Sequence, residues 1–260
     1  MNKEQLKRLN EDPRFISGIH NYCDRWCERC AFTSRCLNFA LCEEEHANPE
    51  TRDLNNEKFW NKLNDNFKVI IEMIYTLAKE RGIELDETEL KEIKKAQCKK
   101  DEDVRNNVLA RAGIQYINMA QSWFDSAEKL FQQKEDELNL HASCGIPGHL
   151  TEALNIEDST EIIHWYQHMI YAKICRALHG DDLDFEGAEE FPRDSDGSAK
   201  VTLIGIDRSI VAWGRLMDQF PDREKSILDI CVHLEKLRKN VELTFPNARK
   251  FVGFSPDLNK

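Results

Sequence analysis

Apolar residues recur at intervals of three and four over most of this chain, which is the spacing of one face of an α-helix. The pattern is clearest at 56–81, 103–140 and 227–241. Only 11 glycines and 7 prolines occur in 260 residues, too few for the many tight turns of a sandwich, barrel or Rossmann-like fold. The sequence therefore predicts an all-α fold, an antiparallel bundle of about five long helices.

Several helix ends can be placed from local signals. Gly82 follows the first stripe, at the position of a C-cap. The run Asp158-Ser159-Thr160-Glu161 has the order of a capping box, so we expect a helix to begin at Asp158 and to end at Gly180. Residues 198–220 include KVTLIGI, which could form a strand. The helical spacing nevertheless continues through Trp213 and Phe220, which favours a helix.

The composition divides the chain into two parts. Residues 1–50 hold five of the nine cysteines and are expected to form a small N-terminal Cys-rich, metal-binding segment. Residues 51–260 are expected to form the helical bundle domain. An acidic linker, 181–197, interrupts this domain.

Charge and hydropathy exclude some classes of function. The net charge is -11, from 36 Lys and Arg against 47 Asp and Glu. Nucleic acid is therefore an unlikely partner, because phosphate binding draws on a surplus of basic residues. No apolar run approaches the length of a membrane-spanning helix, so no membrane partner is expected. The N-terminus has no signal-peptide core, and the crowded cysteines suggest reduced thiols and a cytoplasmic location.

Four cysteines carry the main chemical signal. Cys23, Cys27, Cys30 and Cys36 have the spacing C-x3-C-x2-C-x5-C. Thiolates this close repel one another unless a cation lies between them, so the quartet predicts a metal site. Structural zinc usually takes cysteine pairs from separate elements, whereas four ligands around one short loop suit a cubane. A [4Fe–4S] cluster is therefore the favoured cofactor, zinc is the alternative, and free or regulatory thiols are the third interpretation.

Part of this motif resembles known iron–sulfur sequences. Cys27-Glu28-Arg29-Cys30 followed by Cys36 resembles the end of the cluster loop in endonuclease III-type DNA glycosylases, although their first cysteine usually stands further upstream than Cys23. The first three cysteines also have the spacing of radical S-adenosylmethionine enzymes. In this chain, however, Arg29 stands where those enzymes usually have an aromatic residue before the last cysteine. Cys36 would also fill the iron position that those enzymes leave open. The likeness is limited to the cysteine motif, so we carry no reaction over from either family.

A second candidate site lies on the helix expected from Asp158 to Gly180. Glu161, His164 and His168 fall on one side of this helix, opposite a wide apolar arc. Histidines at positions i and i+4 can share a metal ion, so these three residues are candidate ligands. The alternative is that they are partly exposed side chains on an ordinary helix.

Two functions remain open. The first is a cytosolic helical metal-binding protein with a structural, sensing or interaction role and an unidentified protein partner. The second is a redox or metal-dependent enzyme that uses the cluster, or a site at His164 and His168, on a small molecule. The sequence contains no P-loop, G-x-G-x-x-G or G-x-S-x-G motif, and we recognise no nucleophile–base constellation. We therefore favour the first function.

Overall fold

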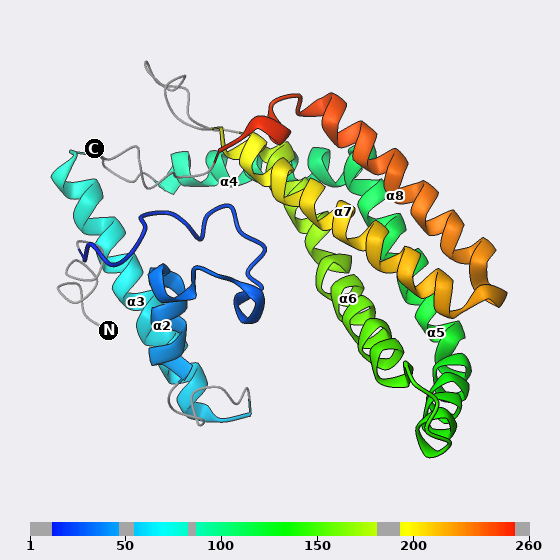
Figure 1. The fold of residues 1–260 in the computed structure, drawn as a ribbon. Coiled ribbons are helices and arrows are strands. Elements are labelled where there is room, and N and C mark those ends of the chain that lie inside the picture. Colours follow the sequence, from blue (N-terminus) through cyan, green and yellow to red (C-terminus); the bar gives the residue numbers. More distant parts are fainter. Residues whose placement is uncertain (1–11, 47–54, 83–86, 181–192, 253–260) are drawn as a thin grey trace. The chain divides into compact units, whose positions relative to one another are not determined.

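The computed structural model describes residues 12–46, 55–82, 87–180 and 193–252. Within these ranges the chain forms seven α-helices, α2 to α8, and four short 3-10 helices, and no strand. The predicted all-α fold is therefore confirmed (Figure 1). The uncertain segment 198–220 is helical, because it lies almost entirely within α7 (Asp194–Gln219).

The chain divides into two compact units between Cys98 and Lys99. The described residues up to Cys98 belong to the first unit, and those from Lys99 to Val252 belong to the second. The division lies inside α4 (Glu87–Asn106), whereas the composition of the sequence suggested a boundary at residue 50. No change of composition marks the division, because the helix is highly charged on both sides of it.

The first unit contains the Cys-rich segment, α2 (Leu37–His46) and α3 (Glu57–Glu80). The side-chain oxygen of Asn56 accepts a hydrogen bond from the backbone N–H of Lys58 at 3.0 Å and so caps the start of α3. Residues 1–11 and 47–50 of the predicted Cys-rich segment lie outside the described residues. The described part of that segment starts at Asp12.

The apolar stripe of α3 is exposed, although the sequence assigned it to a core. Trp60, Phe67 and Ile74 leave 55%, 54% and 54% of their surface accessible. Within the described part of this unit, Ile16 and Trp26 are the apolar side chains that are buried. A core of this size is too small to cover one face of a helix as long as α3.

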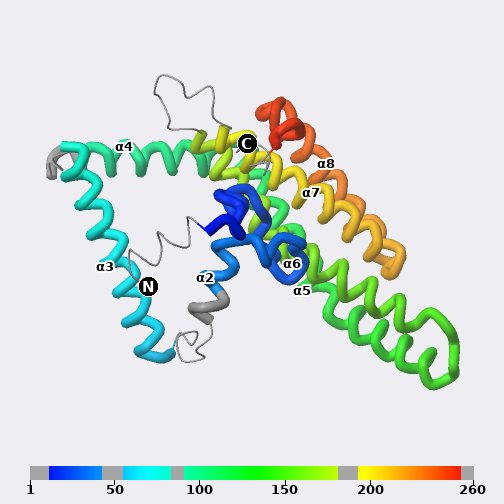
Figure 2. The backbone as a smooth tube through the Cα atoms, turned by 60° about the vertical axis from the view of Figure 1, so that its left-hand side comes forward, coloured from blue at the N-terminus to red at the C-terminus, as the bar shows by residue number. Residues whose placement is uncertain are grey.

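The second unit is built on four long helices: α5 (Val108–Ser143), α6 (His149–His179), α7 and α8 (Glu224–Thr244). Each packs on the next along the chain, and α8 packs back on α5, so the four form a closed ring. Successive helices run in opposite directions, as Figures 1 and 2 show. The bundle described here therefore has four helices around its core, where the sequence suggested about five.

Large apolar side chains fill the centre of this ring. Tyr116, Tyr166, Trp213 and Leu234 are fully buried, one from each helix. Polar groups join neighbouring helices: the amide nitrogen of the Gln167 side chain donates to the carbonyl of Ile117 at 3.1 Å, linking α6 to α5. Because these bonds satisfy groups that are shielded from water, they help to specify how the helices are paired.

The start of α6 corrects one sequence prediction. The helix begins at His149, not at the predicted capping box, and Gly148 precedes it with a φ of 98°. Asp158 instead lies inside the helix, where it accepts a hydrogen bond from Arg215 of α7 at 3.0 Å. The preceding residues, 150–157, include several strong helix formers, which allow the helix to continue through the local signal.

Two further boundaries differ from the sequence prediction. The long stripe 103–140 is interrupted at Asn107, whose side chain accepts from the N–H of Leu109 at 2.8 Å and starts a new helix. The predicted acidic linker is shorter than expected at its C-terminal end, because Asp194 already belongs to α7 and pairs with Arg176 of α6 at 2.6 Å. Residues 181–192 of that linker lie outside the described residues.

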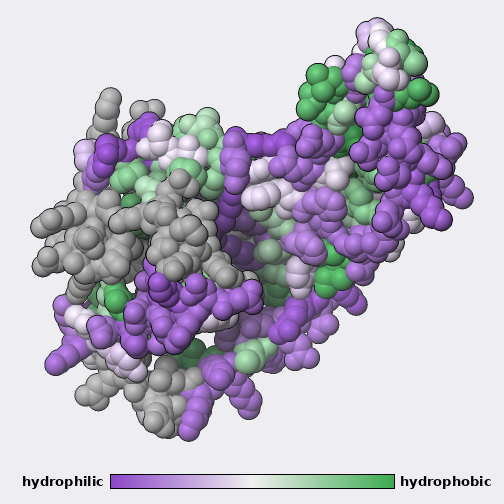
Figure 3. Space-filling view, turned by 90° about the horizontal axis from the view of Figure 1, so that it is seen from below, coloured by the Kyte–Doolittle hydropathy of each residue, from purple (hydrophilic) through white to green (hydrophobic). Residues whose placement is uncertain are grey.

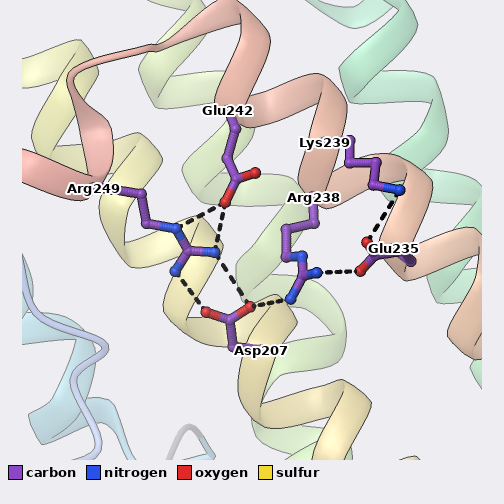
Figure 4. A network of polar contacts seen from close by, with 6 residues as sticks. All are labelled: Asp207, Glu235, Arg238, Lys239, Glu242 and Arg249. Atoms are coloured by element: carbon purple, nitrogen blue, oxygen red, sulfur yellow. Dashed lines mark hydrogen bonds and ion pairs between the residues drawn. The ribbon is translucent and has the colours of Figure 1, made fainter.

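A polar network holds the C-terminal turn, the 3-10 helix Ala248–Lys250, against the ring (Figure 4). Asp207 of α7 accepts from Arg249 at 2.6 Å and from Arg238 of α8 at 3.3 Å. Arg249 also pairs with Glu242 of α8 at 2.8 Å. The Nζ of Lys200 donates to the carbonyl of Phe251, whose side chain is buried. Two helices and the C-terminal turn therefore meet at one carboxylate.

The face drawn in Figure 3 is mostly hydrophilic, with separate hydrophobic patches between the charged residues. None of the helices in the described ranges combines the length and the hydropathy needed to cross a membrane.

Candidate functional site

The Cys-rich segment folds into a closed loop. The backbone N–H of Ile16 donates to the carbonyl of Arg35 at 3.0 Å, which joins the start of the loop to its end. Ile16 and Trp26 are 8% and 3% exposed and form its small core. Asp24 fixes the approach to Trp26, because its carboxylate accepts from the Trp26 N–H at 3.2 Å. Cys23, Cys27 and Cys30 lie within this loop, and Cys36 directly follows its last residue, Arg35.

Two short helical turns space three of the four cysteines. Cys27 begins the 3-10 turn Cys27–Arg29, and the N–H of Cys30 donates back to the carbonyl of Cys27 at 3.1 Å. Cys36 follows the turn Thr33–Arg35 in the same way, with its N–H on the carbonyl of Thr33 at 3.2 Å. All four cysteines are free thiols; Cys30 is exposed and the other three are half-buried.

The other cysteines of the quartet act electrostatically on Cys27. Burial raises the pKa of the Cys27 thiol, and the charges that Cys23, Cys36, Glu28 and Cys30 can carry raise it further. All three other cysteines of the quartet therefore lie near enough to Cys27 to oppose its ionisation. A cation bound among them would reverse this effect, because it would stabilise the thiolates.

The described residues contain no group of three or more acidic, histidine or cysteine side chains already arranged to hold a metal ion. Cys23 shows one reason: its Sγ donates a hydrogen bond to the carbonyl of His20 at 3.3 Å, as a protonated thiol does. Cys30 behaves differently, because its Sγ accepts from the N–H of Phe32 at 3.4 Å. N–H groups directed at sulfur also stabilise metal-bound thiolates. The donor set fits a soft metal, and binding requires Cys23 to lose its proton.

A cation is fixed beside the loop. The guanidinium group of Arg29 lies over the ring of Trp26, 4.1 Å from the ring centroid. This cation–π contact holds a positive charge next in sequence to Cys30. A centre with four thiolate ligands carries net negative charge, which an adjacent guanidinium can partly balance.

The second predicted site is not assembled as a metal centre. Glu161, His164 and His168 are exposed on α6, and within the described chain they do not form a group of three side chains placed to hold a metal ion. The ring of His164 instead stacks on Phe124 of α5, with centroids 4.4 Å apart and an interplanar angle of 29°. His164 is therefore positioned by an aromatic contact between two helices.

A pocket of about 590 Å³ lies between the second half of α5 and the first half of α6. Phe131 and Leu138 line it from α5, and Ala153 and Ile156 line it from α6. No sequence pattern pointed to this pocket, because Ala153 and Ile156 both precede the predicted helix start at Asp158. The pocket could be predicted only from a helix that begins earlier, at His149, because this earlier start lengthens the α5–α6 hairpin.

The closed loop thus offers four sulfur donors that can bind a soft metal ion or an iron–sulfur cluster once they are deprotonated. No family model, curated protein or solved structure matches the chain. The assignment of this site therefore rests on the residues themselves.

Proposed function

We propose that this chain is a helical metal-binding protein in which Cys23, Cys27, Cys30 and Cys36 hold a [4Fe–4S] cluster with a structural or sensing role. One observation carries the proposal: a loop closed by the Ile16–Arg35 hydrogen bond, with Cys36 directly after it, brings three thiols near enough to Cys27 to act on it. Surface cysteines scattered by chance would not lie near enough to Cys27 to raise its pKa in this way.

The path of the chain supports a cluster over zinc. All four sulfurs come from one segment of 14 residues, Cys23–Cys36, with two 3-10 turns between them. Such a loop can wrap around a cubane, whereas zinc is usually held by cysteine pairs from separate elements. Zinc bound to the same four cysteines is the alternative.

A structural role follows from the small core of the first unit. Within its described residues, only Ile16 and Trp26 provide buried apolar side chains. Small domains with such cores commonly need a metal for stability, and the free energy of metal binding then becomes free energy of folding. Binding or loss of the metal would in this way order or release the loop, which is the behaviour of a sensing or interaction module.

The test is metal analysis of the full chain, purified without oxygen and reconstituted with iron and sulfide. We expect about four iron atoms per chain and the visible absorption of an iron–sulfur cluster. Cys27→Ser and Cys36→Ser should each abolish this absorption. Cys98→Ser is the matched control, because Cys98 is an exposed free thiol of the same unit. One tight zinc ion and no iron would replace the cluster by zinc, and retention of metal by all the quartet variants would reject the site.

Reduction separates a structural centre from a redox enzyme. If the cluster only organises the loop, dithionite should bleach it without any turnover of small molecules. Reversible cycling, together with a substrate that reoxidises the protein, would favour the enzyme instead. The same samples thus test both the structural role and the enzyme alternative. The reducing conditions that the cluster needs agree with a cytoplasmic location.

A further inference from the structure

The pocket between α5 and α6 has an apolar interior. Phe131, Leu138 and Ile156 contribute aromatic and aliphatic surface to its lining. Its volume of about 590 Å³ falls within the range of sites for small organic molecules. Both walls belong to the second unit, so the pocket does not depend on the cysteine loop.

The charges on the lining have one dominant sign. Glu135 of α5 and Glu157 and Glu161 of α6 contribute three carboxylates. Glu157 and Glu161 are one turn apart on the same helix, where like charges repel. A cation placed in the pocket would relieve this repulsion.

Lys134 and His164 are the basic residues among those that line this pocket, and other carboxylates already engage Lys134. Its Nζ pairs with Glu137 at 3.3 Å and with Glu152 at 3.4 Å, and its side chain is only 15% exposed. Neither of these two partners lines the pocket. Lys134 therefore contributes little positive charge to a ligand. The three carboxylates outnumber the two basic side chains, so the pocket remains net negative.

One polar atom of the lining lacks a partner. The hydroxyl oxygen of Thr160 is buried and has no hydrogen bond within the described part of the chain. A buried hydroxyl without a partner costs free energy. The ring of His164 also lines the pocket and is held by Phe124, so this wall of the pocket is preorganised on one side.

We propose that this pocket is a binding site for a lipophilic organic cation, a molecule with an apolar body and one positive charge. The body would lie against Phe131, Leu138 and Ile156, and the charge would lie near Glu157 and Glu161. A lipophilic anion of the same shape would meet three carboxylates and a lysine that is already paired. Charge complementarity thus selects the cation. This site is additional to the proposed cysteine centre and does not rest on it.

The test compares two probes of equal shape and opposite charge, tetraphenylphosphonium and tetraphenylborate, by calorimetric titration of the full chain at low ionic strength. We expect the phosphonium ion to bind at least about tenfold more tightly than the borate. Glu157→Gln and Glu161→Gln should each weaken phosphonium binding by roughly three- to tenfold. Both losses of affinity should become smaller as salt is added, because salt screens the carboxylate charges.

Two further variants test the location. Glu128→Gln removes a carboxylate from α5 that does not line the pocket, so it should leave the affinity unchanged. Ala153→Phe fills the pocket and should abolish binding, while circular dichroism confirms that the variant is folded. Equal affinity for both probes, no phosphonium binding, or a loss at Glu128→Gln as large as at Glu157→Gln would overturn the proposal.

Discussion

Two glycines of α7 lie in opposite surroundings. A Cβ at Gly205 would come within 2.9 Å of Cδ1 of Tyr166 and 3.2 Å of Cγ1 of Ile170, both on α6. A Cβ at Gly214 would meet nothing within 4 Å. We expect Gly205→Ala to lower the free energy of unfolding by about 1–3 kcal/mol, because overpacking would separate α6 from α7. Gly214→Ala should raise it by about 0.5–1 kcal/mol, because alanine favours the helix. Urea unfolding of both variants measures the difference, and equal effects would contradict the close approach.

The titration of Tyr116 should make the free energy of unfolding depend on pH. Burial raises its pKa to about 12, whereas an unfolded tyrosine titrates near pH ~10. Its folded pKa is the higher one, so its contribution to stability is complete below pH ~10 and is lost as the pH rises towards ~12. The expected loss is about 2–3 kcal/mol.

Tyr116→Phe isolates this effect from other titrations. The variant leaves Nε1 of Trp213 without its acceptor, which lies at 3.3 Å in the native chain, so it should be less stable than wild type at neutral pH. The difference in free energy of unfolding between wild type and variant should then narrow between pH ~10 and ~12, because only the wild type loses the contribution of Tyr116 there. Denaturant titrations at several pH values measure the gap, and a constant gap would contradict the prediction.

At the scale of elements, Asp207 connects α7, α8 and the C-terminal turn. Replacing it by asparagine removes the negative charge that Arg238 and Arg249 share. The three side chains are each about one-third to two-fifths exposed, so solvent screens the pairs and the expected cost of Asp207→Asn is only about 1 kcal/mol. Molar salt should reduce the difference in stability from wild type.

Lys239→Gln is the control. It removes a single exposed pair with Glu235, so it should cost less stability than Asp207→Asn. Thermal unfolding at low and high salt measures both, and equal costs would mean that the network does not act as a unit.

The sequence predicted helices better than it predicted how they start. The ends at Gly82 and Gly180 are confirmed, because both glycines adopt a positive φ, of 67° and 70°, directly at a helix terminus. The starts of α5 and α6 were missed. Asn107 and the Asp158 run carry similar capping signals, and only the surrounding packing decides that the first caps a helix while the second pairs with Arg215.

The two candidate sites differ in the same way. The cysteine quartet could be recognised because its members are neighbours in the sequence. The pocket joins residues about 20 positions apart, such as Leu138 and Ile156. These residues meet only because α5 turns back through the connection from Cys144 to Gly148. No local pattern encodes that meeting.

For the whole molecule, the distribution of buried apolar side chains predicts two independent transitions. Within the described residues, Ile16 and Trp26 are buried in the first unit, whereas all the other buried apolar side chains belong to the second. The second unit should therefore unfold cooperatively on its own core, and the first should depend on the proposed metal. The boundary suggested by composition, at residue 50, would have assigned α3 to the stable part instead.

Calorimetry of the metal-loaded full chain should resolve these transitions. Removing the metal with a chelator, or introducing Cys27→Ser, should abolish or lower the transition of the first unit and leave that of the second unchanged. Leu234→Ala is the reciprocal variant: Leu234 is fully buried in α8, so its truncation should lower only the second transition, by about 2–5 kcal/mol. If the metal-free chain instead unfolds in a single step whose midpoint shifts as a whole, the two units are thermodynamically coupled. In that case the metal stabilises the entire chain and not the cysteine loop alone.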